Sequence, residues 1–245
     1  MLLKYNAIAC IDRICERFGK TNPILTYNVA QVVVGPHCLG SNDLPLRTLS
    51  LYCLASIVDI LRNDFIPLLQ QALEAAAGCL RESLNNDSPS AKLHNASYSF
   101  FTSVVDRIPF MVPQSFIRTT FELSHLSAAA ALGQEATMNR SQFLQSAATR
   151  LDVNSIFTVA KLVWPSSMKH GNVVSTFLYY LDELLCASTS TCQDVKTHSH
   201  FIKTPPNCSV VCSRKMLAHL GLDIRTSYGH RTDPWEGYTR VCQPP

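Results

Sequence analysis

The chain has 245 residues, of which 47% are hydrophobic and only 16% are charged. A chain of this length and composition can bury a sizeable core, which indicates a globular protein. The formal net charge of +3 comes from basic residues spread along the chain and not from one long basic block. Composition therefore gives little support for a dedicated nucleic-acid-binding domain, although it is compatible with a weak contribution to RNA contact.

The N-terminal segment lacks the features of a secretion signal. Lys4, Asp12 and Arg13 interrupt its apolar residues, whereas a signal peptide has a continuous apolar core and a small-residue cleavage site. The longest uncharged run, residues 21–42, contains two Pro and two Gly residues, which a membrane-spanning helix tolerates poorly. We therefore expect neither a signal peptide nor a transmembrane segment.

Two helices are predicted before residue 35. Residues 3–18 form an amphipathic helix closed by Gly19, and its expected inward side chains are Ile8, Ile11, Ile14, Cys15 and Phe18. Residues 22–34 form a second helix that begins at Pro23, and its apolar side chains are Ile24, Leu25, Tyr27, Val29, Val32 and Val33. Residues 32–34 also favour a strand, but no partner strand with period-two alternation lies nearby.

Residues 43–84 predict the helix pair around which the rest of the chain is organised. Apolar residues recur at helical spacing in both halves, with the short polar segment 62–64 as the turn between them. Asp43 stands at the N-cap position and Pro45 within the first turn. Because both inner faces are apolar, the pair cannot cover its own hydrophobic surface and needs similar pairs beside it.

A second pair with the same pattern is predicted over residues 91–108 and 110–131. In both pairs an aromatic residue opens the second helix with a proline close behind, Phe65 before Pro67 and Phe110 before Pro113. The first helices of successive pairs start near residues 4, 44 and 91, so the pattern recurs about every 40 and 47 residues. That period is typical of HEAT-type helical repeats.

The elements predicted after residue 131 do not repeat the pattern of the two helix pairs. Residues 134–140 are polar and are expected to form a loop, and shorter helices are predicted at residues 141–151, 153–164 and 172–185. After residue 187 the chain is rich in Ser, Thr, Cys, His and Pro without sustained periodicity. The predicted fold class is therefore all-α, an α-solenoid of HEAT-type antiparallel helix pairs over residues 1–187, followed by an irregular, poorly ordered tail over residues 188–245.

The sequence contains no motif typical of an enzyme. It has no G-x-S-x-G, no glycine-rich phosphate loop, no H-E-x-x-H and no paired carboxylates. Asp12, Asp59 and Glu74 fall on helix faces where solvated charge is the usual explanation. His94 is a candidate acid or base, but a His at the start of a helix in a repeat is more often a capping or packing residue. We therefore expect no catalytic residues, no cofactor-binding residues and no metal site.

Two groups of side chains suit either RNA contact or structure. Tyr98, Phe100 and Phe101 could stack on RNA bases, but their helical spacing favours core packing. A small basic cluster at the end of the first helix suits phosphate contact as well as an ordinary surface, and it consists of Arg13, Arg17 and Lys20.

The ten cysteines fall into two groups. Cys10, Cys15, Cys53 and Cys79 lie within apolar helical patterns and are expected to be buried thiols, while Cys38 lies in a loop. In the tail, a zinc site could use Cys192, His198 or His200, Cys208 and Cys212. These pairs do not have the C-x2-C spacing, which favours unpaired thiols.

Three separated stretches resemble one known family. They are ACIDRICERFGKTNP at 9–23, SNDLPLRTLSLYCLASIVDILRNDFIPLL at 41–69 and KLHNASYSFFTSVVDRIPFMV at 92–112. They are similar to the HEAT-repeat region of the U3 small nucleolar RNA-associated protein 10 family, also called HEAT repeat-containing protein 1. The resemblance is strongest over residues 5–124 and thinner over residues 164–185, and the tail from residue 188 does not resemble the family's repeats.

The resemblance implies a non-catalytic scaffold in the nucleolus. The family belongs to the small-subunit processome with the U3 ribonucleoprotein, supports early pre-18S ribosomal RNA processing and is linked to ribosomal DNA transcription. The implied partners are processome proteins and U3 small nucleolar RNA, without a membrane or a small-molecule substrate. The alternative is a general HEAT or armadillo adaptor outside the nucleolus, which periodicity alone does not exclude.

Overall fold

The computed structural model describes residues 2–85, 89–130 and 132–151, all within one compact unit, Met1–Val163. These residues form α-helices and two short 3-10 turns, and they contain no strand. The predicted elements at residues 153–164, 172–185 and 188–245 lie outside the described residues. The elements are α1 (Leu2–Phe18), α2 (Pro23–Val34), α3 (Leu44–Leu61), η1 (Arg62–Phe65), α4 (Ile66–Ser83), α5 (Ala91–Arg107), η2 (Pro109–Met111), α6 (Gln114–Ala129) and α7 (Gln134–Arg150).

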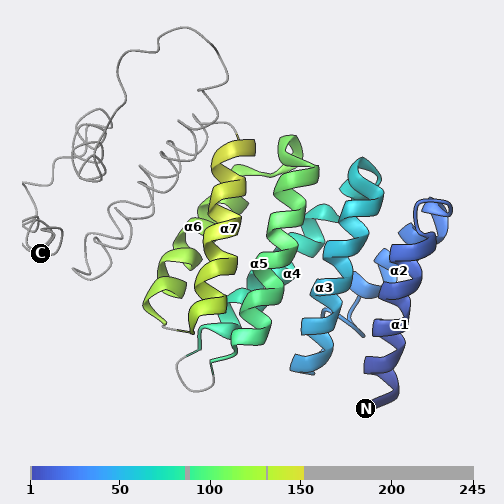
Figure 1. Cartoon of the computed structure of the whole chain (residues 1–245), viewed down its shortest axis with the longest axis horizontal. Coiled ribbons are helices and arrows are strands. Elements are labelled where there is room, and N and C mark those ends of the chain that lie inside the picture. Colours follow the sequence, from blue (N-terminus) through green and yellow to red (C-terminus); the bar gives the residue numbers. More distant parts are fainter. Residues whose placement is uncertain (1, 86–88, 131, 152–245) are drawn as a thin grey trace, which may run out of the picture. The chain divides into compact units, whose positions relative to one another are not determined.

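The helices are arranged in two layers (Figure 1). The odd-numbered helices lie side by side, with α3 between α1 and α5, and α5 between α3 and α7. The even-numbered helices form the second layer, in which α4 contacts α2 and α6. The layers meet where α2 packs on α3 and α4 packs on α5. Side-chain contacts also join the predicted pairs, through Arg47 with Glu82 between α3 and α4 and through His94 with Ser127 and Tyr98 with Ser124 between α5 and α6.

The helix starts follow from local chemistry. Asp43 caps α3 by accepting a hydrogen bond from the backbone N–H of Leu46 at 3.3 Å, and Ser90 caps α5 by accepting one from Leu93 at 3.4 Å. Pro residues stand in the first turns of α2, α3 and α4, where the missing N–H has no helical partner to lose. Gly133 precedes α7 at φ +98°, a conformation that favours glycine.

The core lies between the layers and is centred on α3 and α5. The largest fully buried side chains include Leu51, Leu54 and Ile57 of α3 together with Tyr98, Phe100 and Phe101 of α5. The stretch Leu44–Ser83 is apolar enough, by length and composition, to cross a membrane. It forms two helices joined by a turn, and burial between neighbouring helices accounts for its apolar composition.

Three of the polar side-chain interactions at the helix ends join residues far apart in the sequence. The Tyr5 hydroxyl donates to the Asp43 carboxylate at 2.8 Å, which ties α1 to the start of α3. Arg47 of α3 forms a two-pronged ion pair with Glu82 of α4, with both N–O distances at 2.5 Å. At the opposite ends of α3 and α5, Arg107 donates to Asp59 at 2.8 Å.

Residues 134–140 are the first of two segments where the prediction was wrong. They form the first two turns of α7 and not a loop. They contain no Pro or Gly, and Ala136 and Arg140 are buried. Their polar residues are those of a helix whose outer side faces solvent, and Gln, Glu, Ala and Met are all good helix formers.

Phe110 is the second correction. The sequence placed it at the start of a helix, but α6 begins at Gln114 and Phe110 lies in the turn η2. Val112 separates η2 from Pro113, which is extended and forms the N-cap of α6. The helix therefore starts after the proline, and the aromatic residue stays at the tip of the turn.

The first two helices bury different side chains from those expected. In α1, Ile8 and Cys15 are buried against the core, whereas Ile14, Phe18 and Cys10 are exposed. In α2, Ala30, Val33 and Val34 are buried, whereas Ile24, Leu25 and Val32 are exposed. For α1 the physical reason is that, within the part of the chain that the structure describes, it has an odd-layer neighbour on one side only, which is α3. Apolar residues on its other side have no helix among the described residues to pack against.

Candidate interaction surfaces

His94 lies in the interior and has a structural role there. Its Nε2 contacts the Ser127 hydroxyl of α6, and its Nδ1 lies 3.3 Å from the Asn95 side-chain oxygen. Burial lowers the pKa of His94 to about 4, so the ring is neutral at pH 7. A fully buried, neutral imidazole bonded to its neighbours fits the packing interpretation and not that of an acid or base acting on a substrate.

The three aromatic residues of α5 are core residues. Tyr98, Phe100 and Phe101 have no exposed surface. The ring of Phe101 meets Phe116 edge-on at 5.0 Å, and the Tyr98 hydroxyl lies 2.8 Å from that of Ser124. Stacking on RNA bases needs an exposed ring face, so the core-packing prediction is confirmed for these residues.

The candidate acids do not converge on one site. Asp59 is paired with Arg107, and Glu74 accepts a hydrogen bond from Gln70 at 3.1 Å on the surface of α4. Asp12 is half-buried in α1, and burial raises the pKa of its carboxyl group. Within the described residues, no three His, Cys, Asp or Glu side chains come close enough to hold a metal ion.

The cysteines of the described part are free thiols. Cys15, Cys53 and Cys79 are buried as predicted, Cys38 is half-buried, and Cys10 is exposed, contrary to the prediction. Burial raises the pKa of the Cys53 and Cys79 thiols, which keeps them protonated and unreactive at neutral pH. The alternative zinc ligands, from Cys192 to Cys212, lie outside the described residues.

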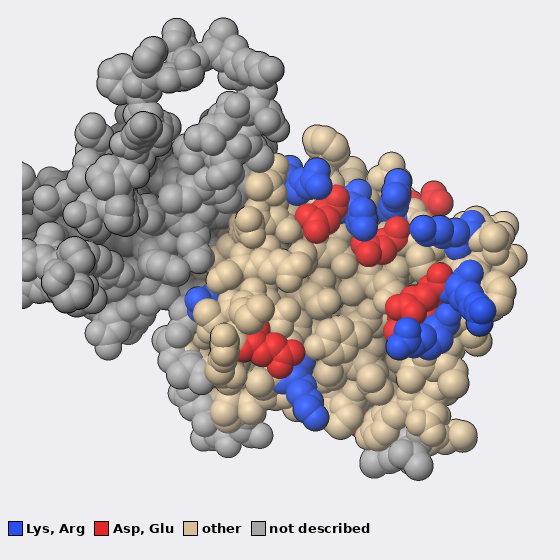
Figure 2. Space-filling model, in the orientation of Figure 1, with Lys and Arg blue, Asp and Glu red and all other residues tan. Residues whose placement is uncertain are grey.

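Basic side chains do not form a continuous stripe on the visible face. Figure 2 shows Lys and Arg side chains alternating with Asp and Glu side chains, with uncharged surface between them. In the basic cluster at the end of α1, Arg13 is paired with Glu16 at 3.0 Å, which leaves Arg17 and Lys20. This pattern is weaker than the clustered positive charge on which nucleic-acid-binding domains depend.

Arg140 of α7 is a buried residue that the sequence did not single out. It is 8% exposed, and its Nε has no hydrogen-bond partner. Its charge contributes to the lowered pKa of His94. The only sequence signal was its place, four residues after Ala136 and three before Phe143, both of which are buried. That spacing predicts that the three residues lie on one side of the helix. It does not predict that a charged side chain would be buried there.

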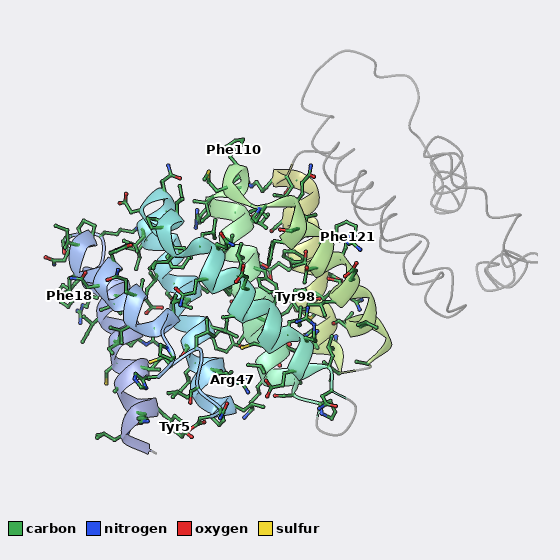
Figure 3. The ribbon with its side chains drawn as sticks, turned by 180° about the vertical axis from the view of Figure 1, so that it is seen from behind. Tyr5, Phe18, Arg47, Tyr98, Phe110 and Phe121 are labelled. Carbon is green, nitrogen blue, oxygen red and sulfur yellow. The ribbon has the colours of Figure 1, made fainter. Side chains whose placement is uncertain are left out.

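Exposed apolar side chains form two surfaces suited to binding another protein. The first is the end face, defined here as the exposed large apolar residues of α1 and α2, which are Leu3, Ile14, Phe18, Ile24, Leu25 and Val32. The second is the turn η2, where Phe110 is 96% exposed beside the partly exposed Met111. Figure 3 shows Phe110 projecting beyond the ends of the helices, while Tyr98 lies among the helices.

These observations define the class of protein to which the described part belongs. The described part is an all-helical protein of antiparallel helix pairs, which is compatible with HEAT repeats. The His and aromatic residues proposed from the sequence are buried in its core, and exposed apolar residues occupy one end and one turn.

Comparison with known proteins then gives the family. The chain is 35% identical over 184 residues, 75% of its length, to U3 small nucleolar RNA-associated protein 10 of Chaetomium globosum. It is 36% identical over 171 residues to the protein of that name in Aspergillus niger and 34% identical over 171 residues to the one in Neurospora crassa. The matched stretch belongs to the same family as a segment of these proteins, as its sequence resemblance predicted.

The match covers a small part of each relative. The chain spans about 10% of the length of the Chaetomium globosum and Neurospora crassa proteins and 9% of the Aspergillus niger protein. No family model matches the chain. No solved structure matches it either.

Proposed function

We propose that this chain acts as a non-catalytic scaffold segment of the small-subunit processome in nucleolar pre-18S ribosomal RNA processing and ribosome biogenesis. The observation that carries the proposal is the match of about three quarters of the chain to relatives named U3 small nucleolar RNA-associated protein 10. The proposed partners are processome proteins and the U3 ribonucleoprotein, in the nucleolus. Any RNA contact is weak or indirect, and neither a membrane nor a small-molecule substrate takes part.

The proposed mechanism is geometric. Helix pairs packed in two layers would continue as a solenoid over residues 1–187, with residues 188–245 as a separate tail. Side chains buried between layers hold the array together, and the outer sides and turns bind partners. The exposed apolar residues of α1, α2 and η2 support this proposal, because exposed apolar surface is typical of protein-binding sites.

Affinity purification of the full tagged chain from a nucleolar extract, with and without ribonuclease, tests this function. We expect U3 RNA and processome proteins to be recovered, and the proteins to persist after ribonuclease treatment because the contacts are between proteins. Recovery of neither, from a chain that circular dichroism shows to be helical, would contradict the scaffold role. It would favour a helical adaptor outside the nucleolus.

A core variant controls for non-specific capture. Leu54→Asp places a carboxylate where the side chain has no exposed surface, and an unpaired buried charge is strongly destabilising. Specific partners should be lost with this variant, whereas material that binds any exposed hydrophobic chain should remain or increase. Equal recovery of U3 RNA by both chains would mean that the folded array is not what binds.

A further inference from the structure

Arg140 of α7 is the only Lys, Arg, Asp or Glu residue that is buried in the described part of the chain. It is 8% exposed, and its Nε has no hydrogen-bond partner. None of the ion pairs of the described part includes it. A buried charge is strongly unfavourable unless it is paired and hydrogen-bonded. Arg140 therefore has the donors of an anion-binding group without a carboxylate partner among the described residues.

Two other buried polar atoms of the described part lack partners, but their groups are satisfied in other ways. Arg47 Nε belongs to a guanidinium whose other two nitrogens bind Glu82. Asp12 Oδ1 belongs to a half-buried carboxyl group that forms a hydrogen bond with Ser56. Arg140 differs from both because it combines burial with the lack of a described counter-charge.

The charge of Arg140 faces the interior between α5 and α7. It shares one side of α7 with the buried Ala136 and Phe143, and the ring of Phe143 lies 5.5 Å from that of Tyr98 in α5. Burial lowers the pKa of His94 and raises that of Tyr98 to about 12, and the charge of Arg140 adds to the first shift and opposes the second. The guanidinium is therefore within electrostatic range of two buried side chains of α5.

The polar side chains that surround this position are neutral. His94 Nδ1 lies 3.3 Å from Asn95 Oδ1, which only accepts, so Nδ1 carries the proton and Nε2 accepts from Ser127 of α6. The Tyr98 hydroxyl pairs with that of Ser124 in α6. All five residues are buried. Neutral hydroxyl, amide and imidazole groups solvate a guanidinium but do not neutralise its charge.

The carboxylates of the same three helices do not neutralise the guanidinium either. Each helix contains one. Asp106 of α5 lies 3.9 Å from Arg150, and Glu122 of α6 is paired with Arg118 at 3.0 Å. Glu135 of α7 is exposed in the first turn of its helix. The cluster between α5, α6 and α7 thus has a net positive charge at pH 7.

The chemistry of this position selects a small oxyanion as its ligand. A guanidinium presents a planar fork of N–H donors that matches two oxygens of a phosphate or sulfate group. The remaining oxygens of such an ion accept hydrogen bonds from hydroxyl groups, which this cluster supplies. Because Arg140 is only 8% exposed, the backbone of an RNA chain has little access to it. A free inorganic ion has no such restriction.

We propose that Arg140 and the buried hydroxyl groups between α5, α6 and α7 bind a small inorganic oxyanion of the phosphate or sulfate class. The ion pairs with the guanidinium and neutralises the buried charge. It thereby ties α7 to the pair formed by α5 and α6. This proposal does not depend on a role in ribosome assembly.

Thermal unfolding of the full chain in sulfate and in chloride at equal ionic strength tests the proposal. Sulfate at about 10 mM should raise the melting temperature of the native chain by roughly 4 °C or more over chloride. Arg140→Met replaces the buried cation by an apolar side chain of similar length, so it should melt at or above the native chain in chloride and should not respond to sulfate. Arg118→Met removes an exposed cation of α6 and should keep the native response.

The titration of His94 gives a second reading in the native chain, which does not depend on how well a variant folds. An anion bound beside the ring favours the imidazolium form. The pKa of His94, followed by nuclear magnetic resonance, should therefore be higher in sulfate than in chloride, whereas that of the exposed His37 should stay unchanged. Sulfate is the chosen probe because it keeps its double charge throughout this pH range.

Three outcomes would overturn the proposal. The first is an equal response of the native chain and Arg140→Met to sulfate, which would show a general salt effect or an ion bound elsewhere. The second is a His94 titration that is the same in both salts. The third is stabilisation by a short single-stranded RNA that Arg140→Met abolishes, because the ligand would then be a phosphate of a polymer and not a free ion.

Discussion

The helix pairs α3–α4 and α5–α6 have similar turns in sequence, yet they place the aromatic residue of the turn in opposite environments. Phe65 has no exposed surface, and its ring meets Phe100 edge-on at 6.4 Å, whereas Phe110 is 96% exposed. One residue separates Phe65 from Pro67, while two separate Phe110 from Pro113. Pro67 is within the first turn of α4 but Pro113 is the N-cap of α6. Phe65 is therefore the N-cap of α4, whereas Phe110 precedes the N-cap of α6 by three residues.

The interiors of the two pairs differ as well. In α3 and α4 the buried hydroxyl groups bond within their own helix, as Ser50 does to the carbonyl of Leu46 at 2.8 Å. In α5 and α6 some buried hydroxyls also bond within their own helix, as Ser97 does to the carbonyl of Leu93 at 2.9 Å, but two buried polar contacts cross between the helices, His94 with Ser127 and Tyr98 with Ser124. The polar contact between α3 and α4 is the Arg47–Glu82 ion pair, whose carboxylate is partly exposed, whereas the contacts between α5 and α6 are buried, and their loss leaves unsatisfied groups.

The largest expected effect is the difference in stability between variants of the two aromatic residues of the turns. Phe65→Ala should lower the free energy of unfolding by roughly 3–5 kcal/mol, because it removes a fully buried ring and leaves a cavity. Phe110→Ala should change it by no more than about 0.5 kcal/mol, because the ring is exposed. Urea unfolding followed by circular dichroism measures both. Similar losses for the two variants would mean that Phe110 is packed in solution.

The second prediction concerns pH and the buried histidine of α5. Burial lowers the pKa of His94 to about 4, the hydrogen bond with Asn95 opposes this shift, and the charge of Arg140 adds to it. In the unfolded chain the pKa is about 6.5, so between these values the unfolded state binds more protons. The contribution of His94 to the free energy of unfolding should be fully present above about pH 6.5. The free energy of unfolding should fall by roughly 2–4 kcal/mol as the pH drops to about 4.

Replacing the histidine isolates its share of that pH dependence. Urea unfolding of the native chain and of His94→Gln should be compared at pH 7 and pH 5. The variant should be less stable at pH 7 but should lose less on acidification. His37→Gln, which changes an exposed histidine outside the helices, should keep the native dependence. Identical pH slopes for the native chain and His94→Gln would show that His94 is not the group responsible.

A third, smaller effect tests the polar contacts that cross between α5 and α6. Tyr98→Phe removes the hydroxyl 2.8 Å from Ser124 Oγ and should cost about 1–2 kcal/mol of unfolding free energy. Tyr52→Phe removes a hydroxyl from a partly exposed tyrosine of α3 and should cost no more than about 0.5 kcal/mol. Combining Tyr98→Phe with Ser124→Ala should give less than the sum of the single losses. Additive losses would show that the two hydroxyls do not interact.

The helices of the described part could be predicted from the sequence because local signals specify them. Apolar spacing located α1 to α6, and Asp43 marked the start of α3. The partners of side chains could not be predicted, because periodicity contains no information on pairing: Arg47 and Glu82 are 35 residues apart, and His94 and Ser127 are 33 apart. Nor could periodicity distinguish the buried Ile8 from the exposed Ile14, since both lie at helical spacing and only the neighbouring helix decides.

The smallest expected effect concerns η1, the turn between α3 and α4. Arg62 has φ +50° and ψ −118°, and it is the only non-glycine residue with positive φ among the described residues. A side chain is strained in this region, whereas glycine is not. Arg62→Gly should therefore raise the free energy of unfolding by about 0.5–1 kcal/mol, after the extra freedom of glycine in the unfolded chain is subtracted.

The neighbouring residue provides the control for this gain. Asn63 is also exposed in η1 and has negative φ, so Asn63→Gly adds only unfolded-state freedom and should be slightly destabilising. Arg62→Ala removes the charge but keeps the strained backbone, so it should leave stability nearly unchanged. If Arg62→Ala stabilised the chain as much as Arg62→Gly, the gain would come from the loss of charge. The strained turn would then not be what distinguishes the α3–α4 connection from the proline-bracketed connection of α5 and α6.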